Sequence, residues 1–90
     1  MKTYKITVDI YGNNFETQPR YRIFVDGNLL TERDFIWHPK KIYISEQIYV
    51  NLEPGGHCLS IEQISGTPDS IIARNITLDD QPSSLHFVTS

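Results

Sequence analysis

Cysteine occurs only once in the 90 residues, at Cys58. A single cysteine excludes an intrachain disulfide and a zinc site built from several cysteines, so the chain is not a small secreted scaffold held by bridges. Alanine also occurs once, at Ala73, and methionine only at Met1. Because both residues favour helices, their scarcity beside many isoleucines, valines, threonines and tyrosines favours strands.

The sequence also lacks long apolar runs and an excess of positive charge. No segment is long or apolar enough for a signal peptide or a transmembrane helix, so we expect a protein made in a cytoplasm, with no membrane partner. The formal net charge is −3 and the basic residues are scattered, which disfavours nucleic acid as a partner. A chain of 90 residues fits one domain, so we expect residues 1–90 to form a single unit.

Short segments of alternating apolar and polar residues cover most of the chain. Residues 3–11 alternate from Tyr4 to Ile10, which is the period of a strand with one buried face. Asp26-Gly27 is a strong hairpin signal, and Pro54-Gly55-Gly56 marks another turn. About eight strands are expected, at residues 3–11, 20–26, 29–37, 42–45, 47–52, 57–64, 71–78 and 85–89. Such regular short strands predict an all-β sandwich of jelly-roll or immunoglobulin-like type.

Two stretches depart from simple alternation. In residues 29–37, Leu29 and Arg33 are spaced as on one face of a helix, while Arg33 and Phe35 are spaced as on one face of a strand. We expect a strand, because the segments on both sides are strands. The apolar alternation also changes parity within residues 61–64, which predicts a β-bulge there.

Residue types used in catalysis are present, but their arrangement does not support catalysis. His57 and Cys58 are adjacent, and adjacent strand residues point to opposite faces of a sheet. Asp79 and Asp80 are neighbours in an expected turn, where aspartate commonly bonds to the local backbone. The sequence contains neither a Gly-x-Ser-x-Gly elbow nor a phosphate-binding loop. We therefore expect a protein that is not an enzyme, with no catalytic residue, no cofactor and no metal site.

Aromatic residues are more numerous than a core this thin can bury. Tyr11 and Tyr49 fall on the polar side of their strands, and Trp37 ends a strand beside a turn. Exposed aromatics on a sheet suit a protein interface or stacking on sugar rings. The alternative is that they stabilise the sheet, as a second buried layer or as cross-strand pairs. The residues predicted for an interface are Tyr11, Phe15, Phe35, Trp37 and Tyr43.

Three motifs follow one another between Tyr21 and Asp80. They are Val25-Asp26-Gly27, Leu52-Glu53-Pro54-Gly55-Gly56-His57 and Arg74-Asn75-Ile76-Thr77-Leu78-Asp79. This order resembles the calcium-dependent xylan-binding modules, which implies a β-sandwich with a glycan as its ligand. That family usually holds calcium with an aspartate directly before the arginine, where this chain has Ala73, and the preceding loop offers only Asp69. Since a calcium site normally needs several carboxylates, the resemblance implies the fold without the metal site.

Three further segments carry a second resemblance. They are Tyr21-Arg22-Ile23-Phe24-Val25-Asp26, Leu29-Leu30-Thr31-Glu32-Arg33 and Phe35-Ile36-Trp37. They resemble small β-sandwich proteins encoded by tailed phages of marine cyanobacteria, which implies a virion part assembled in the host cytoplasm. The expected function is a decoration or connector subunit that docks on other virion proteins or on copies of itself. The alternative is a carbohydrate-binding module with a degenerate calcium site.

Overall fold

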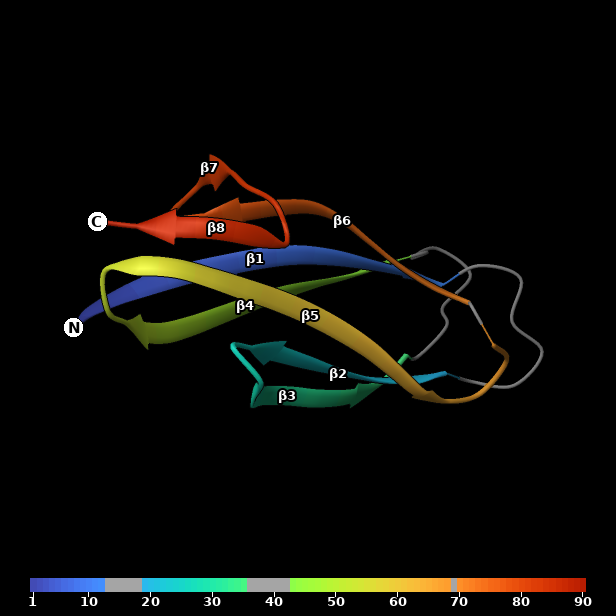
Figure 1. Cartoon of the computed structure of the whole chain (residues 1–90). Helices are drawn as coiled ribbons and strands as arrows, with labels where there is room; N and C mark the ends of the chain where they lie inside the picture. The colour runs from blue at the N-terminus through green and yellow to red at the C-terminus, as the bar shows by residue number, and fades with distance from the viewer. Residues whose placement is uncertain (13–18, 36–42, 69) are drawn as a thin grey trace.

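Two antiparallel four-stranded sheets form a β-sandwich in the computed structural model, which describes residues 1–12, 19–35, 43–68 and 70–90 (Figure 1). The strand order is β4-β1-β6-β7 in one sheet and β3-β2-β5-β8 in the other. This confirms the predicted all-β sandwich. The strands are β1 (Lys2–Gly12), β2 (Arg20–Val25), β3 (Asn28–Asp34), β4 (Tyr43–Leu52), β5 (Gly55–Ser65), β6 (Ile71–Leu78), β7 (Gln81–Pro82) and β8 (His86–Thr89). The described ranges contain no helix long and apolar enough to span a membrane.

The core lies between the sheets and is built from the alternation seen in the sequence. On β1, the side chains of Ile6, Val8 and Ile10 point inward and are buried. On β2, Tyr21 and Ile23 face them from the other sheet, and both are buried. Burying one such side chain stabilises the fold by about 1.5–3 kcal/mol, so these two central strands anchor the sandwich.

One strand is longer than the apolar pattern predicts. Residues 42–45 and 47–52 are expected as separate strands, but Tyr43–Leu52 forms the single strand β4. Glu46 lies at an inward-facing position of β4, with only 4% of its surface exposed. Its carboxylate accepts a hydrogen bond from the Tyr21 hydroxyl at 3.2 Å and pairs with the Arg33 guanidinium at 2.5 Å. These two partners allow a charged residue to face inward, so the strand continues through Glu46.

The stretch that fits both a helix and a strand is a strand, β3, which ends at Asp34. Phe35 comes directly after it, donates its N–H to the Pro19 carbonyl at 2.8 Å, and is only 1% exposed. Phe35 therefore belongs to the core, which corrects its expected place at an interface. The remainder of the predicted strand, including Trp37, lies outside the described residues.

The predicted bulge in residues 61–64 is confirmed. Tyr21 of β2 pairs with Gln63, whereas the adjacent Arg20 pairs with Ser65, so Ile64 is an extra residue on β5.

The expected turn at residues 79–83 contains the two-residue strand β7, which pairs with the end of β6. Both termini lie at the same end of the sandwich (Figure 1).

Candidate interaction surface

The outer face of the β4-β1-β6 sheet carries three tyrosines. Since the even-numbered residues of β1 point into the core, the odd-numbered residues of β1 and their partners on β4 point outward. The register places Tyr11 opposite Tyr43 and Lys5 opposite Tyr49. Tyr49 is 68% exposed and Tyr43 is 42% exposed. They lie six positions apart along the strand, so the surface between them extends for about 20 Å.

Tyr11 and Tyr43 form a cross-strand stack at one end of this surface. Their ring centroids are 5.1 Å apart and their planes make an angle of 27°. The guanidinium carbon of Arg74, on β6, lies 5.8 Å from the centroid of the Tyr11 ring. Stacked rings and a cation over an aromatic face each contribute a fraction of a kcal/mol to about 1 kcal/mol at an exposed site. These contacts favour the stacked arrangement of the Tyr11 and Tyr43 rings in the free chain.

We define the tyrosine face as the outward side chains of Tyr11, Tyr43 and Tyr49 with the row of outward polar residues on β4. That row runs along β4 and contains no charge; its members are Ser45, Gln47 and Asn51. Tyrosine combines a large apolar ring with a hydroxyl and has few rotatable bonds, so it contributes contact area at a low entropic cost. A tyrosine-bearing sheet face suits contact with another protein or with a sugar.

The structure brings two of the five predicted interface residues together, namely Tyr11 and Tyr43. Phe35 lies in the core, and Phe15 and Trp37 lie outside the described residues. Tyr49 is the residue that the prediction left out, although its position on the polar side of its strand was a visible signal.

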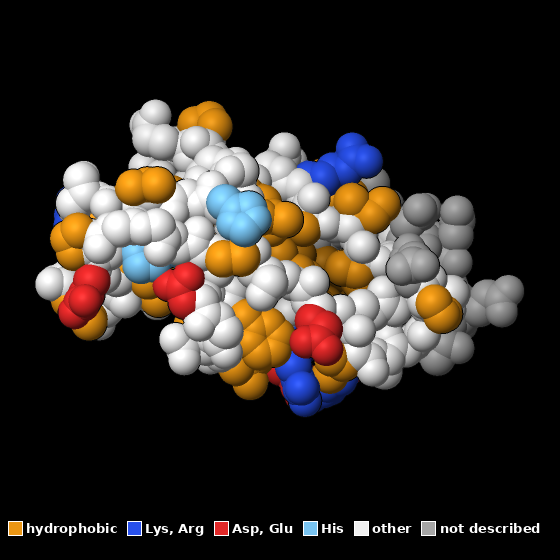
Figure 2. All heavy atoms as spheres, in the orientation of Figure 1, with side chains coloured by type: hydrophobic (Ala, Val, Ile, Leu, Met, Phe, Trp, Pro, Cys, Tyr) orange, Lys and Arg blue, Asp and Glu red, His pale blue; other side chains and the backbone are white. Residues whose placement is uncertain are grey.

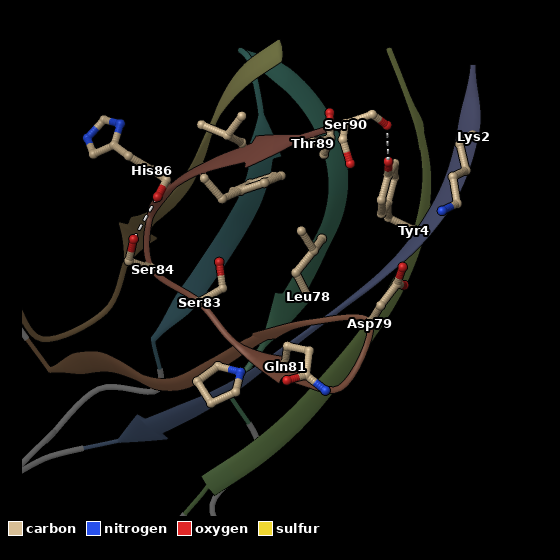
Figure 3. A pocket seen from close by; sticks show the side chains of 13 residues that line it. Lys2, Tyr4, Leu78, Asp79, Gln81, Ser83, Ser84, His86, Thr89 and Ser90 are labelled. Carbon is tan, nitrogen blue, oxygen red and sulfur yellow. Dashed lines mark hydrogen bonds between the residues drawn. The ribbon is translucent and has the colours of Figure 1, made fainter. Parts of the chain in front are cut away.

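A groove of about 570 Å³ lies beside β7 and β8, close to the N-terminus of β1 (Figure 3). The Tyr4 hydroxyl donates to the Ser90 carbonyl at 3.4 Å, and the Ser84 hydroxyl donates to the His86 carbonyl at 2.6 Å (Figure 3). Lys2 and Asp79 also line the groove but form no ion pair with each other. The groove thus offers separate polar groups around its rim and no acid–base pair in contact.

His57 makes the most extensive side-chain contacts of the described histidines. Its Nδ1 lies 2.6 Å from the Asp26 carboxylate, and its Nε2 lies 2.8 Å from the Glu53 carbonyl oxygen. Both acceptors need a proton from the ring, so the geometry fits the doubly protonated imidazolium. The Thr89 hydroxyl is 3.2 Å from Nε2 and itself donates to the Glu53 carbonyl at 2.7 Å. Because Nε2 donates to the Glu53 carbonyl, it is not placed to take a proton from Thr89. The His57 ring instead connects the turns at Asp26 and Glu53 with Thr89 of β8.

The contact with Asp26 raises the pKa of His57, and the Glu53 carbonyl raises it further. The contact with His57 also lowers the pKa of Asp26, with help from the backbone N–H of Cys58. Stability from the raised histidine pKa is fully present below its ordinary value of 6.5 and is lost as pH rises through the folded-state pKa. Stability from the lowered aspartate pKa is present above its ordinary value of 3.8 and is lost as pH falls through the folded-state pKa.

We expect the pair to contribute most between pH 3.8 and 6.5, and Asp26→Asn to remove that contribution. Asparagine tolerates the left-handed backbone of this turn, where φ is 52°, and its side-chain oxygen still accepts the Cys58 N–H. Urea denaturation across pH 4–9 measures the difference. In the wild type, the free energy of unfolding should fall above neutral pH more than in the variant. Parallel pH profiles would contradict the assignment.

The three motifs behind the first resemblance all have roles in holding the fold. Asp26 of the first motif pairs with His57 of the second. In the third, Asn75 has a φ of 54° and lies in a β-bulge of β6, since Thr7 pairs with Thr77 while Asp9 pairs with Arg74. Ala73, at the place of the calcium-binding aspartate, pairs with Ile10 on the inward side of the sheet. These positions explain the motifs without a ligand.

No protein-family model matches this chain, and no curated protein or solved structure was found to be similar to it. The two resemblances therefore stay predictions.

Proposed function

We propose that this chain is a non-enzymatic structural subunit of a virus particle, which docks on other protein subunits or on copies of itself through the tyrosine face. The observation that carries the proposal is the exposure of Tyr49 and Tyr43 on the outer face of β4, an edge strand whose outward residues carry no charge. Interfaces draw most of their energy from a few aromatic anchors that become buried on contact. Segments between Tyr21 and Trp37 resemble small proteins of tailed cyanophages, and this resemblance is why we propose a virus particle as the assembly.

A carbohydrate-binding module is the second candidate. The stacked rings of Tyr11 and Tyr43 support it, because sugar rings stack on exposed aromatic faces. The motif order shared with xylan-binding modules supplies the class of glycan. Calcium would have no part in this binding, since Ala73 faces inward at the position where that family carries its aspartate.

Two measurements, each made with and without calcium and soluble xylan, separate the two candidates. They are light scattering of the purified chain and co-sedimentation of the chain with cyanophage particles. A structural subunit should sediment with cyanophage particles or exceed the monomer mass of 10.4 kDa, and neither additive should change the result. A monomer that xylan stabilises against heat would contradict the proposal and favour the glycan module.

The double variant Tyr43→Ala/Tyr49→Ala tests which surface is used. If the tyrosine face is the interface, each truncation removes an aromatic anchor worth about 1–2 kcal/mol, so docking should weaken about 30-fold or more. The matched control is Val88→Ala on β8, which removes an exposed apolar side chain from the other sheet. Equal loss in both variants would contradict the assignment of the interface.

A further inference from the structure

The sandwich is open along one side, where β5 and β6 face each other from different sheets. Only residues 55–58 of β5 pair with β8, and only Thr77 and Leu78 of β6 pair with β7. Between the uncovered parts lies a slot of about 280 Å³. Its lining residues are Ile61, Gln63, Ile71, Ala73 and Leu85. Figure 2 shows hydrophobic side chains in a hollow on this side of the molecule.

The backbone of β5 presents hydrogen-bonding groups along this opening. The N–H of Leu59 donates to the carbonyl of Leu85 at 2.7 Å, and Leu85 directly precedes the first residue of β8. Since backbone groups alternate sides along a strand, the N–H and C=O of Ile61 and Gln63 point in the same direction as those of Leu59. No described strand continues β8 alongside them. Such an edge is a template for an added strand.

The Gln63 side chain lies at the far end of the slot. The side-chain amide of Gln63 donates to the Ser65 carbonyl at 3.1 Å and to the Thr67 carbonyl at 2.5 Å. Its oxygen accepts the Ser70 N–H at 3.2 Å. These bonds tie Thr67 and Ser70 to the end of β5, so the Gln63 side chain is held in place before a ligand binds.

Glu62 adds a charge preference to this edge. It points to the outer side of β5, beside Arg22 of β2, and is exposed. Arg22 is paired with Glu32, and within the described ranges the Glu62 carboxylate has no ionic partner. A positively charged side chain on an added strand would lie directly opposite Glu62.

We propose that this slot accepts an extended segment of a partner protein, which adds a strand to β5 in line with β8 and antiparallel to β5. Apolar side chains at alternate positions enter the slot opposite Ile61 and Gln63, and a lysine or arginine between them faces Glu62. This inference rests on the proposed function as a subunit that docks on proteins, and it uses a surface separate from the tyrosine face.

The probe is the capped peptide acetyl-Thr-Val-Lys-Val-Thr-amide, added at millimolar concentration to the isotope-labelled chain. Amide hydrogen exchange at Ile61 and Gln63 should slow by about tenfold or more on binding, because their N–H groups gain carbonyl partners. N-methylation of both valines removes the peptide donors that face β5 and should abolish this protection. N-methylation of the lysine is the matched control, since that N–H faces away from β5 and the protection should remain.

Two variants test the site itself. Glu62→Lys should reverse the preference, so that a peptide with glutamate in place of lysine becomes the better ligand. Ala73→Phe should fill the slot from within and remove peptide binding, while Tyr49→Ala should leave it unchanged. Intact docking in Tyr49→Ala would contradict the proposed function, whereas loss of peptide binding in that variant would contradict this inference, so the two failures are distinguishable.

Four results would overturn the inference. The first is unchanged exchange at Ile61 and Gln63 with peptide present. The second is full protection of both amides in the free chain, which would mean that the chain closes its own edge. The third is equal binding of the valine-methylated peptide, which would indicate a simple apolar pocket. The fourth is protection that depends only on protein concentration, which would identify a second copy as the occupant.

Discussion

Phe35→Ala is expected to lower the free energy of unfolding by about 3–5 kcal/mol, the range for truncating a buried phenylalanine. Phe35 is 1% exposed and closes the core directly after β3 ends. The truncation removes apolar burial and leaves a cavity that the surrounding strands only partly fill. Because a domain of this size has roughly 5–15 kcal/mol of stability, the loss should lower Tm by more than about 10 °C.

Thermal and urea unfolding monitored by circular dichroism measure this effect. Tyr49→Ala is the matched control, because its side chain is 68% exposed and its removal should change stability by no more than about 0.5 kcal/mol. If Phe35→Ala unfolded like the control, the placement of Phe35 in the core would be wrong and its predicted role at an interface would return.

The second large effect is expected from Arg33→Ala. Among the described residues, this change leaves the buried carboxylate of Glu46 with the Tyr21 hydroxyl as its remaining bonded partner. Removing one partner of a fully buried ion pair costs about 3–5 kcal/mol. Since the Arg33 side chain is 51% exposed, water screens part of the interaction, and we expect about 1–3 kcal/mol.

Glu46→Gln in the Arg33→Ala background tests the cause. Glutamine removes the buried charge but keeps an oxygen that accepts the Tyr21 hydroxyl proton. Burial, together with the nearby Glu46 carboxylate, raises the pKa of Tyr21, so its hydroxyl stays protonated and donates at ordinary pH. We expect the double variant to recover most of the lost stability in a urea titration. A double variant that is less stable than Arg33→Ala alone would show that the buried charge is not the source of the effect.

The sequence alone predicts the strands whose alternation is complete. Residues 3–11 and 20–26 correspond to β1 and β2, and Asp26-Gly27 forms the turn between β2 and β3. A strand break was expected near Glu46 because a charged residue in an apolar row usually marks the end of a buried strand. That prediction was wrong, since β4 continues through Glu46. Here the neutralising groups come from the other sheet, and such long-range partners do not appear in local periodicity.

The surfaces were harder to predict than the strands. Alternation indicates that Tyr11 and Tyr49 face outward, but only the register of β1 against β4 places Tyr11 beside Tyr43. Phe35 was assigned to an interface because a core this thin was not expected to bury every aromatic residue, yet Phe35 is buried directly after β3 ends. The slot between β5 and β6 depends on how far β8 and β7 reach along their neighbours, which no sequence pattern specifies.

Hydroxyl-radical footprinting of the chain, free and mixed with cyanophage particles, tests whether partners dock on the tyrosine face. Oxidation of Tyr49 should fall several-fold on binding, and that of Tyr43 should fall with it. Tyr21 is fully buried and should react slowly in both states, which makes it the internal reference. Equal oxidation of Tyr49 in the free and bound chain would contradict the claim and move the interface to another surface.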